Sequence, residues 1–431
     1  MREERSSATT EPHSRRGEGA RKPARLLPLL ALTVVIQQID RNLPNVLMEP
    51  LKQEFQLTDS HLGLLAGTMF AMSYFVAGVP LGRLADRTNR RNLLAALLTI
   101  WSTLTALSAF AGSFLALAIA RIGIGAAESG TIPAAMSMVS DVVPEQRRAT
   151  SSGLIYGAAM FGGFVSYLLG GLVAENWGWR AAFLMAGIPG LILAALLILV
   201  AKEPLRTTGE LAVSHRGNVW HDMGQLLFHR VLGPLYVGAT LCTLVASAIG
   251  AWAVSLLVRV HGLTLPEAGL AAALAMGLCG AAGTSLMGLA ADWAGRQSAG
   301  HVLRVPAVGA AILTLSGWAF ATGETGYGAI AGLCLAGFMS QAHAGAIVGT
   351  ISRVAPPEIR ALAFALFSVV GSVIGLAIGP YLVGVLSDAS TAAQPLPAAI
   401  VAILPIMVAP IALFLLAAQR LDRPLVSEQT R

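Results

Sequence analysis

The stretch Gly82-Arg-Leu-Ala-Asp-Arg-Thr-Asn-Arg-Arg91 is a short basic segment between two long apolar runs. Its glycine and acid recur in the second half of the chain, in Gly288-Leu-Ala-Ala-Asp292-Trp. A second pair repeats in the same order, because Pro144-Glu-Gln-Arg147 is echoed by Pro357-Glu-Ile-Arg360. The sequence therefore predicts two related halves, with a site near the middle of the membrane between them.

The composition indicates that a lipid bilayer is the solvent for this chain. Of the 431 residues, 55% are hydrophobic and only 12% are charged, whereas about 25% of the residues of a soluble domain are charged. The formal charge of +6 does not indicate a nucleic-acid partner, because the basic residues lie in short loops between apolar runs. Such loops orient a membrane protein.

Twelve apolar runs are long enough to cross the hydrocarbon, which takes about 20 residues of helix. They predict an all-α membrane protein with two pseudo-symmetric six-helix halves. Their expected limits are 26–48, 61–84, 92–111, 114–138, 150–173, 180–201, 232–257, 267–290, 301–322, 326–350, 360–386 and 396–418.

The polar segments predict the division of the chain and its orientation. We expect a cytoplasmic tail (1–25), an N-terminal half (26–201), a cytoplasmic linker (202–231), a C-terminal half (232–418) and a second cytoplasmic tail (419–431). With the N-terminus inside, the outer loops hold only Lys52, Arg180 and Arg259 of the 29 lysines and arginines. This asymmetry predicts a multi-pass inner-membrane protein with both termini in the cytoplasm.

The basic segment 82–91 resembles the cytoplasmic loop motif of the major facilitator superfamily. Asn89 stands where most members of that superfamily have glycine, and we expect it to tolerate a left-handed turn. The resemblance implies transport by alternating access, with a charge-paired gate on the inner face; the alternative is that these charges only anchor the loops. The expected gate residues are Gly82, Asp86, Arg87, Arg90, Arg91, Asp141, Arg147, Asp292 and Arg360.

Several shorter patterns resemble the bacterial spinster-like branch. They are Ile39-Asp40-Arg41 in the first run, Trp101-Ser102 in the third, and Arg121-Ile-Gly-Ile-Gly-Ala-Ala-Glu128 in the fourth. Ala127 departs from the branch, which usually has glycine before its glutamate. The branch carries lysolipids and sphingoid phosphates, so the resemblance implies an anionic, lipid-like substrate. The Asp-Arg pair also resembles the anion:cation symporters, which take up small organic acids.

Charges within a spanning helix cost about 2.5–3.5 kcal/mol each on insertion scales and usually mark function. We expect Asp40, Arg41, Arg121 and Glu128 to share one pocket, with Arg121 and Glu128 on one helix face and Gly125 allowing a close neighbour. Asp40 and Glu128 are the predicted proton carriers. Burial favours the neutral form of such an acid and nearby arginines favour its ionised form, so a change of surroundings can change its protonation.

The predicted substrate-binding residues extend this pocket. Arg41 and Arg121 are expected to bind an anionic head group, and to pair with the acids when substrate is absent. Tyr74 and His343 are predicted to line the site as well. The alternative is that the four charges form structural ion pairs and that the aromatic residues only pack.

Other functions find less support in the sequence. No nucleophile–base pair, phosphate-binding glycine loop or metal-binding pattern is evident, so we expect no enzyme activity, cofactor or metal. Cys242, Cys279 and Cys334 are expected to be small buried side chains. A membrane sensor without transport is a further alternative. The expected partners are a small or lipid-like substrate, protons and membrane lipids, and we expect the monomer to function.

Overall fold

The computed structural model describes residues 23–204 and 219–422, and these ranges are almost entirely helical. Parts of the predicted tails and linker, namely residues 1–22, 205–218 and 423–431, lie outside the described residues. Among the described residues, eight helices or groups of abutting helices are, by length and composition, long and apolar enough to cross a membrane. Within the described ranges, each of the twelve predicted runs coincides with a helix, part of a helix or a group of abutting helices.

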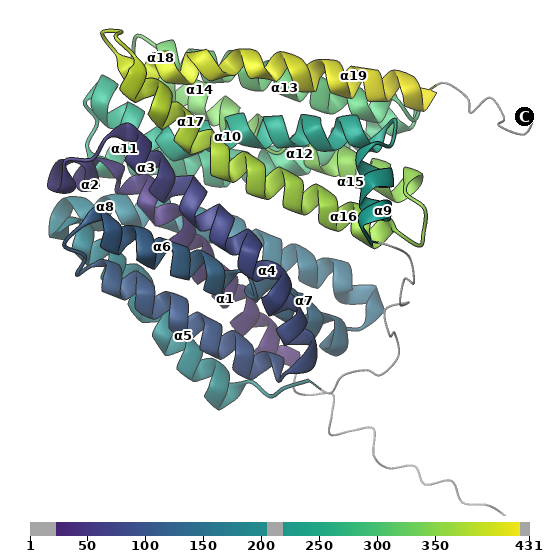
Figure 1. Cartoon of the computed structure of the whole chain (residues 1–431), viewed down its shortest axis with the longest axis horizontal. Helices are drawn as coiled ribbons and strands as arrows, with labels where there is room; N and C mark the ends of the chain where they lie inside the picture. Colours follow the sequence, from purple (N-terminus) through teal and green to yellow (C-terminus); the bar gives the residue numbers. More distant parts are fainter. Residues whose placement is uncertain (1–22, 205–218, 423–431) are drawn as a thin grey trace, which may run out of the picture.

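The first half of the chain forms one bundle of helices (Figure 1). Its elements are α1 (Pro23–Val46), α2 (Met48–Phe55), α3 (Asp59–Gly63), the π-helical η1 (Leu64–Thr68), α4 (Met69–Arg87), α5 (Arg90–Ser108), α6 (Phe114–Glu128), α7 (Thr131–Val142) and α8 (Glu145–Val200). The fifth and sixth predicted runs both lie in α8. They are separated by Gly178, whose φ of 81° breaks the helix and suits glycine.

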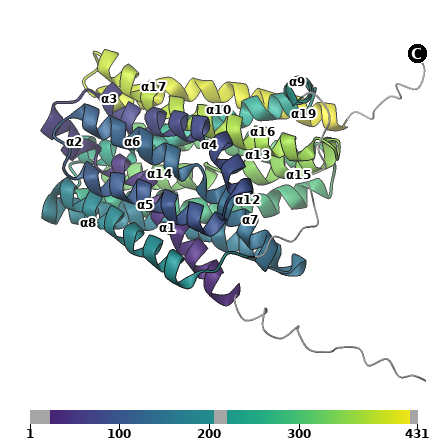
Figure 2. The same ribbon diagram turned by 60° about the horizontal axis from the view of Figure 1, so that its bottom comes forward.

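The second half forms the other bundle, which runs from teal through green to yellow in Figure 1. Its elements are α9 (Val219–Leu227), α10 (Leu232–His261), α11 (Leu265–Ala272), η2 (Ala273–Cys279), α12 (Gly280–Gly295), α13 (His301–Thr322), α14 (Gly326–Met339), α15 (Ala344–Val354), α16 (Arg360–Val369), η3 (Val370–Ile374), α17 (Gly375–Ala389), α18 (Pro395–Ile403), η4 (Leu404–Met407) and α19 (Val408–Asp422). Helix α9, which lies in the predicted linker, packs against α10 and α16 (Figures 1 and 2).

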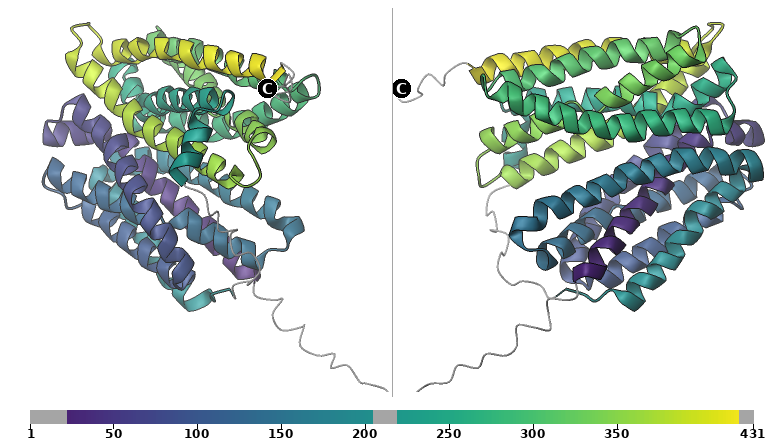
Figure 3. Two further views of the ribbon diagram at one scale, coloured as in Figure 1. Left: turned by 45° about the vertical axis from the view of Figure 1, so that its right-hand side comes forward. Right: turned by 180° about the vertical axis from the view of Figure 1, so that it is seen from behind.

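The two bundles meet at one end of the molecule and splay apart at the other (Figures 1 and 3). The end where they meet carries α2, α3 and α11, and we call it the closed end. The splayed end carries α7 and α16, and we call it the open end. Helix α1 begins and α19 ends on the open side, so both ends of the described chain lie on the same side of the molecule.

Glycine and proline let the bundles touch through their backbones near the closed end. A Cβ added to Gly63 would lie 2.5 Å from the carbonyl oxygen of Pro380, and one at Gly269 would lie 2.5 Å from that of Tyr167. The hydroxyl of Thr68 donates to the carbonyl oxygen of Ala377 at 2.5 Å. The absence of side chains at these glycines therefore sets how closely the halves approach.

A cluster of charges ties the halves together at the closed end. Arg259 of α10 donates to Glu49 at 2.7 Å and to both carboxylate oxygens of Asp59, at 2.8 and 2.9 Å. Asp388 of α17 accepts from the backbone amides of Asp59 and Ser60 at 2.9 and 2.8 Å. We call these residues the closed-end cluster, because each of these bonds joins the N-terminal half to the C-terminal half.

Asn89 corrects one expectation from the sequence. It has an extended backbone (φ −69°, ψ 110°), not a left-handed one, and its side chain accepts from the amide of Asn92. Asn89 is therefore the N-cap of α5, a position that asparagine favours because its side-chain oxygen satisfies a free amide.

Arg259→Gln tests the closed-end cluster. The change leaves Asp59, whose side chain is 5% exposed, with one fewer cation. We expect the free energy of unfolding to fall by about 2–3 kcal/mol. This is less than the ~3–5 kcal/mol lost when a fully buried ion pair is broken, because Arg259 is partly exposed. A reporter cysteine, Ser60→Cys in a background without other cysteines, measures opening of the closed end. We expect a maleimide to label it faster when Arg259→Gln is also present.

Arg180→Gln is the matched control. Arg180 pairs with Glu54 at 3.0 Å, but both side chains are more than 40% exposed. We expect the free energy of unfolding to change by less than about 1 kcal/mol and the labelling rate of Ser60→Cys to stay the same. Equal effects of the two variants would mean that the closed-end cluster does not hold the halves together.

Candidate functional site

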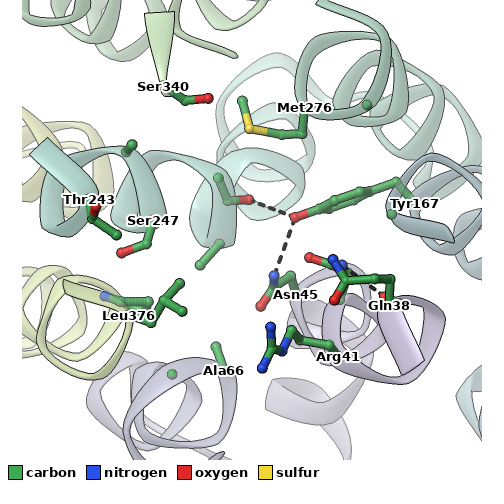
Figure 4. Close-up of a pocket in the computed structure, with 18 of the residues that line it drawn as sticks. Gln38, Arg41, Asn45, Ala66, Tyr167, Thr243, Ser247, Met276, Ser340 and Leu376 are labelled. Atoms are coloured by element: carbon green, nitrogen blue, oxygen red, sulfur yellow. Dashed lines mark hydrogen bonds between the residues drawn. The ribbon is translucent and has the colours of Figure 1, made fainter. Parts of the chain in front are cut away.

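A cavity of about 310 Å³ lies between the two halves. Figure 4 shows that α1, η1 and α8 line it from one side, and α10, η2 and α17 from the other. Helix α1 contributes Gln38, Arg41, Asn42 and Asn45, which are all polar. Met276 of η2 and Leu376 of α17 are among the apolar residues that line the opposite side. We call this space the central cavity; the part of its wall formed by α1 is polar, and the opposite wall mixes apolar side chains with the polar side chains of Thr243, Ser247, Ser340 and Gln341.

Arg41 carries the charge of the central cavity. It is the only ionisable side chain with a charge at neutral pH among the described lining residues. Its guanidinium carbon lies 4.6 Å from the centre of the Phe70 ring and 5.0 Å from that of Tyr74, so the cation stacks on both rings. Its buried Nε atom has no hydrogen-bond partner in the described chain. The guanidinium is thus fixed in place but still able to donate to an anion.

Tyr167 bridges the halves beside the cavity, and the sequence did not single it out. Its hydroxyl accepts from the Asn45 side chain at 3.3 Å and donates to the carbonyl oxygen of Gly250 in α10 at 3.2 Å (Figure 4). A tyrosine in an apolar run gives no sequence signal for such a contact. The approach of α8 to α10 creates it.

The two predicted proton carriers are buried in the N-terminal half. Asp40 is 3% exposed and Glu128 is fully buried. None of their four carboxyl oxygen atoms has a hydrogen-bond partner within the described residues. Neither residue lines the central cavity, because adjacent residues of a helix point about 100° apart and Arg41 takes the cavity side. The four charges therefore do not share one pocket, contrary to expectation.

Arg121 binds backbone atoms, not the acids. Its guanidinium donates to the carbonyl oxygens of Leu65, Asp40 and Arg41, at 3.1, 3.2 and 2.7 Å. The Asp40 carbonyl lacks its usual helical donor because residue 44 is a proline. The Leu65 carbonyl lies in η1, where the amide of Met69 bonds Leu64 instead. Arg121 satisfies carbonyl groups that these two irregularities free.

The expected pairing of Arg41 and Arg121 with the acids is therefore not observed. Within the described chain, no carboxylate lies within 4.0 Å of either guanidinium. The expected close approach at Gly125 is present, because a Cβ there would lie 2.6 Å from the carbonyl oxygen of Phe70. Arg121 and Glu128 do share the buried side of α6.

The other two predicted binding residues sit at the edge of the site. Tyr74 stacks on Arg41 but does not line the cavity. His343 is 4% exposed at the start of α15 and is likewise absent from the lining, whereas its neighbours Ser340 and Gln341 are present in it. The break between α14 and α15 brings these two polar side chains to the cavity, and the sequence did not predict them.

The predicted gate residues divide into two groups. Arg90 donates to Asp141 at 2.5 Å and to Glu203 at 2.8 Å, and the backbone amide of Arg91 donates to Glu203. These bonds hold together the N-terminal half and the first residues of the predicted linker. Glu203 was missed because it lies in the predicted linker.

The remaining predicted gate residues lie near the open end. Arg360 donates to the carbonyl oxygen of Ala355 in its own loop, and Asp292 lines a small surface pocket with Arg353. A Cβ added at Gly82 would meet nothing within 4 Å. The side chains of Asp86, Arg87 and Arg147 are exposed.

A comparison with family models decides the relationship of this chain to known proteins. The Major Facilitator Superfamily model matches residues 30–380. The chain belongs to the Major Facilitator Superfamily. It is therefore a multi-pass membrane transporter of the kind that moves small molecules across membranes.

Individual relatives include exporters, spinster proteins and organic-anion transporters. The chain is 30% identical to an MFS-type efflux pump of Mycolicibacterium smegmatis, over 86% of each chain. It is 32% identical to Protein spinster homolog 3 of Mus musculus, over 52% of this chain and 45% of that one. It is also 26% identical to a probable galactarate/D-glucarate transporter of Bacillus subtilis, over 61% and 63%. The spinster resemblance expected from the sequence is confirmed.

A solved structure shows the same fold. It is the crystal structure of a bacterial homologue of the human lysosomal transporter Spinster, in an inward-facing and unoccupied conformation. The TM-score is 0.84 at 24% identity, over 95% of this chain and all of that one. This likeness confirms the predicted all-α major facilitator fold.

Arg121→Lys tests whether the guanidinium fork is needed. Lysine keeps the charge, but its single ammonium group cannot reproduce the planar fork that reaches three carbonyl oxygens. Each buried carbonyl left unpaired costs about 1–3 kcal/mol. We therefore expect a lower unfolding midpoint in detergent, whereas the exposed Arg180→Lys should leave it unchanged. An unchanged midpoint for both variants would show that charge alone suffices at position 121.

Proposed function

We propose that this protein is a proton-coupled secondary transporter of an anionic, amphipathic substrate of the lysophospholipid or sphingoid-phosphate type. The observation that carries the proposal is Arg41, a stacked cation in a cavity whose opposite wall includes the apolar side chains of Met276 and Leu376. Its planar fork suits a phosphate or carboxylate head group. Met276 and Leu376 on the opposite side suit an acyl chain.

The buried acids support proton coupling. An ionised carboxylate with neither an ion pair nor a hydrogen bond is costly to bury. Asp40 and Glu128 are buried and have neither kind of partner within the described chain. We therefore infer that both are protonated in this conformation. A conformation that brings water or a cation to Asp40 would release its proton. Proton coupling requires such a difference in protonation between the two conformations.

The shape of the molecule supports alternating access. We propose that residues 26–201 and 232–418 move as two bodies, and that the closed end faces outward and the open end faces the cytoplasm of the inner membrane. The closed-end cluster and the glycine contacts would then have to separate in the outward-open state. The predicted distribution of lysine and arginine assigns the open end to the inside.

A second candidate is the transport of small organic anions with proton coupling. A volume of about 310 Å³ is at the lower end for a ligand pocket. Relatives include a probable sulfoacetate transporter of Cupriavidus necator, 31% identical over 38% of this chain. The apolar side chains of Met276 and Leu376 in the opposite wall favour the amphipathic substrate over this alternative.

The decisive experiment measures proton flux in liposomes that contain a trapped pH-sensitive dye. A lysophospholipid, a sphingoid phosphate and a small organic dianion are added in turn, with protein-free liposomes as a control for leakage. We expect the two amphipathic anions to drive a pH change that Asp40→Asn abolishes. Arg41→Gln should raise the KM about tenfold or more, because it removes a charge-assisted hydrogen bond worth about 1.5–3 kcal/mol.

Arg180→Gln, which lies outside the site, should behave as the wild type. A response to the small dianion alone would favour the second candidate. Substrate movement without a pH change, at equal rates in the wild type and Asp40→Asn, would exclude proton coupling and leave a facilitator.

A further inference from the structure

Asp40 faces a second, much smaller space inside the N-terminal half. This space has a volume of about 20 Å³ and is bounded by α1, α2, α5, α6 and α8. Its lining includes Asp40, Leu51, Thr105, Ser108, Leu117 and Arg121, and we call it the N-terminal chamber. It shares no lining residue with the central cavity. Helix α1 therefore separates the two spaces, with Arg41 on one side and Asp40 on the other.

Unpaired polar atoms gather around the Asp40 carboxyl group. Trp101 and Thr105 of α5 face it, and both residues are at most 1% exposed. The indole Nε1 of Trp101, the hydroxyl of Thr105 and both carboxyl oxygens of Asp40 have no hydrogen bond of normal geometry among the described residues, although Trp101 and Thr105 lie close enough to the carboxyl group to interact with it. Buried polar groups without a partner are rare, and a bound water is a common reason for them.

The chamber has room for a single water. A cavity needs about 10–15 Å³ to hold one, together with two to four polar partners, and the chamber offers about 20 Å³. A water there can donate to the Asp40 carboxyl oxygen, because Asp40 lines the chamber. Trp101 is outside the lining, but its indole N–H lies near the same carboxyl group and can help to orient it. The Thr105 hydroxyl can donate or accept to complete the set.

The chamber extends from Asp40 toward the closed end. Ser108 is the last residue of α5, and Leu117 lies in the first turn of α6. Leu51 belongs to α2, which also lies at the closed end. The central cavity, by contrast, lies between the halves on the Arg41 side of α1. The two spaces thus lie against opposite faces of α1.

We propose that the N-terminal chamber holds an internal water that exchanges the Asp40 proton with the closed end of the molecule, by a route separate from the substrate cavity. Trp101 and Thr105 are positioning residues: Thr105 holds this water against the carboxyl group, and Trp101 orients the carboxyl group. The inference rests on the proposed proton coupling and specifies its route. Proton and substrate can then bind together without competing for one entrance.

The charged groups near Asp40 come from two helices. Arg41 is on α1 itself, and Arg121 and Glu128 are on α6. From α5, the uncharged side chains of Trp101 and Thr105 interact with the Asp40 carboxyl group. Helix α8 contributes Ser166, whose hydroxyl donates to the carbonyl oxygen of Ile39. A change at Thr105 therefore alters hydration at Asp40 without removing a charge.

The first experiment compares Thr105→Val with Thr105→Ser. Valine keeps the shape but removes the hydroxyl, and serine keeps the hydroxyl. We expect Thr105→Val to lower substrate-driven proton flux by roughly tenfold and to move its pH profile, since positioned proton transfer contributes at least that much. Thr105→Ser should resemble the wild type. The KM for substrate should change by less than about twofold in both, because Thr105 does not line the central cavity.

Trp101→Phe repeats the test by removing only the indole N–H. It should give the same loss of proton flux with an unchanged KM, provided that the protein remains monodisperse in gel filtration. Wild-type flux and pH profile in both Thr105→Val and Trp101→Phe would overturn the proposal. A raised KM with normal proton flux would also overturn it, because it would assign these residues to substrate binding.

The second experiment measures proton exchange at Asp40 with the central cavity blocked. Asn42→Cys, in a background where Cys242, Cys279 and Cys334 are alanine, is modified with a bulky maleimide, and loss of substrate binding confirms the block. The infrared band of the protonated Asp40 carboxyl group is identified by its absence in Asp40→Asn. Its shift is then followed after transfer to D₂O. Phe161→Cys, which is exposed and outside the cavity lining, is the labelling control.

We expect equal exchange rates with and without the block, and slower exchange in Thr105→Val. A block that stops exchange would place the proton route in the substrate cavity and overturn the proposal, as would the absence of the carboxylic acid band. This readout does not need transport. The two proposals can therefore be told apart. If exchange at Asp40 is normal but no substrate drives proton flux, the proposed function is excluded and the proton route through the chamber is retained.

Discussion

The three hydrogen bonds that Arg121 donates to backbone carbonyl oxygens underlie the arrangement of the site. In a bilayer, a helix that departs from regular geometry must find other partners for its freed backbone groups. Two such departures face each other here, the proline at position 44 of α1 and the π-helical turn η1. One buried guanidinium serves both. It thereby fixes the part of α1 that presents Arg41 to the central cavity and Asp40 to the N-terminal chamber.

That division gives α1 two functional faces. On one face, Arg41 stacks on aromatic rings and keeps donors available to an anion. On the other, Asp40 lies among uncharged polar groups of α5 in a space that fits a single water. A ligand on one face and a proton on the other would act on the same turn of helix. Coupling between them then needs no direct contact between substrate and carboxylate.

The contact between the halves has a different physical basis at each end. At the closed end, glycines allow backbone-to-backbone contact, and Arg259 binds acids that come from the other half. At the open end, the strong ion pairs of Arg90 hold together the N-terminal half and the first residues of the linker as a unit. Polar contacts across the closed end can exchange protein partners for water when the halves separate. An apolar interface of the same size would resist such opening more strongly.

The sequence by itself determined the membrane environment, the repeat and the superfamily, because hydropathy and loop motifs are local properties that survive without contacts. It also identified Asp40, Arg41, Arg121 and Glu128 as unusual, since a charge in an apolar run is visible in one dimension. It did not determine how these four residues are distributed in space. Only the tertiary structure turned Asp40 away from the cavity, gave Arg121 three carbonyl oxygens as partners, brought Tyr167 and Glu203 into contact with distant segments and placed Ser340 in the lining of the central cavity. Those outcomes depend on helix rotation, on breaks in the helices and on the approach of segments far apart in the chain, and none of these is encoded in the spacing of residues along one run.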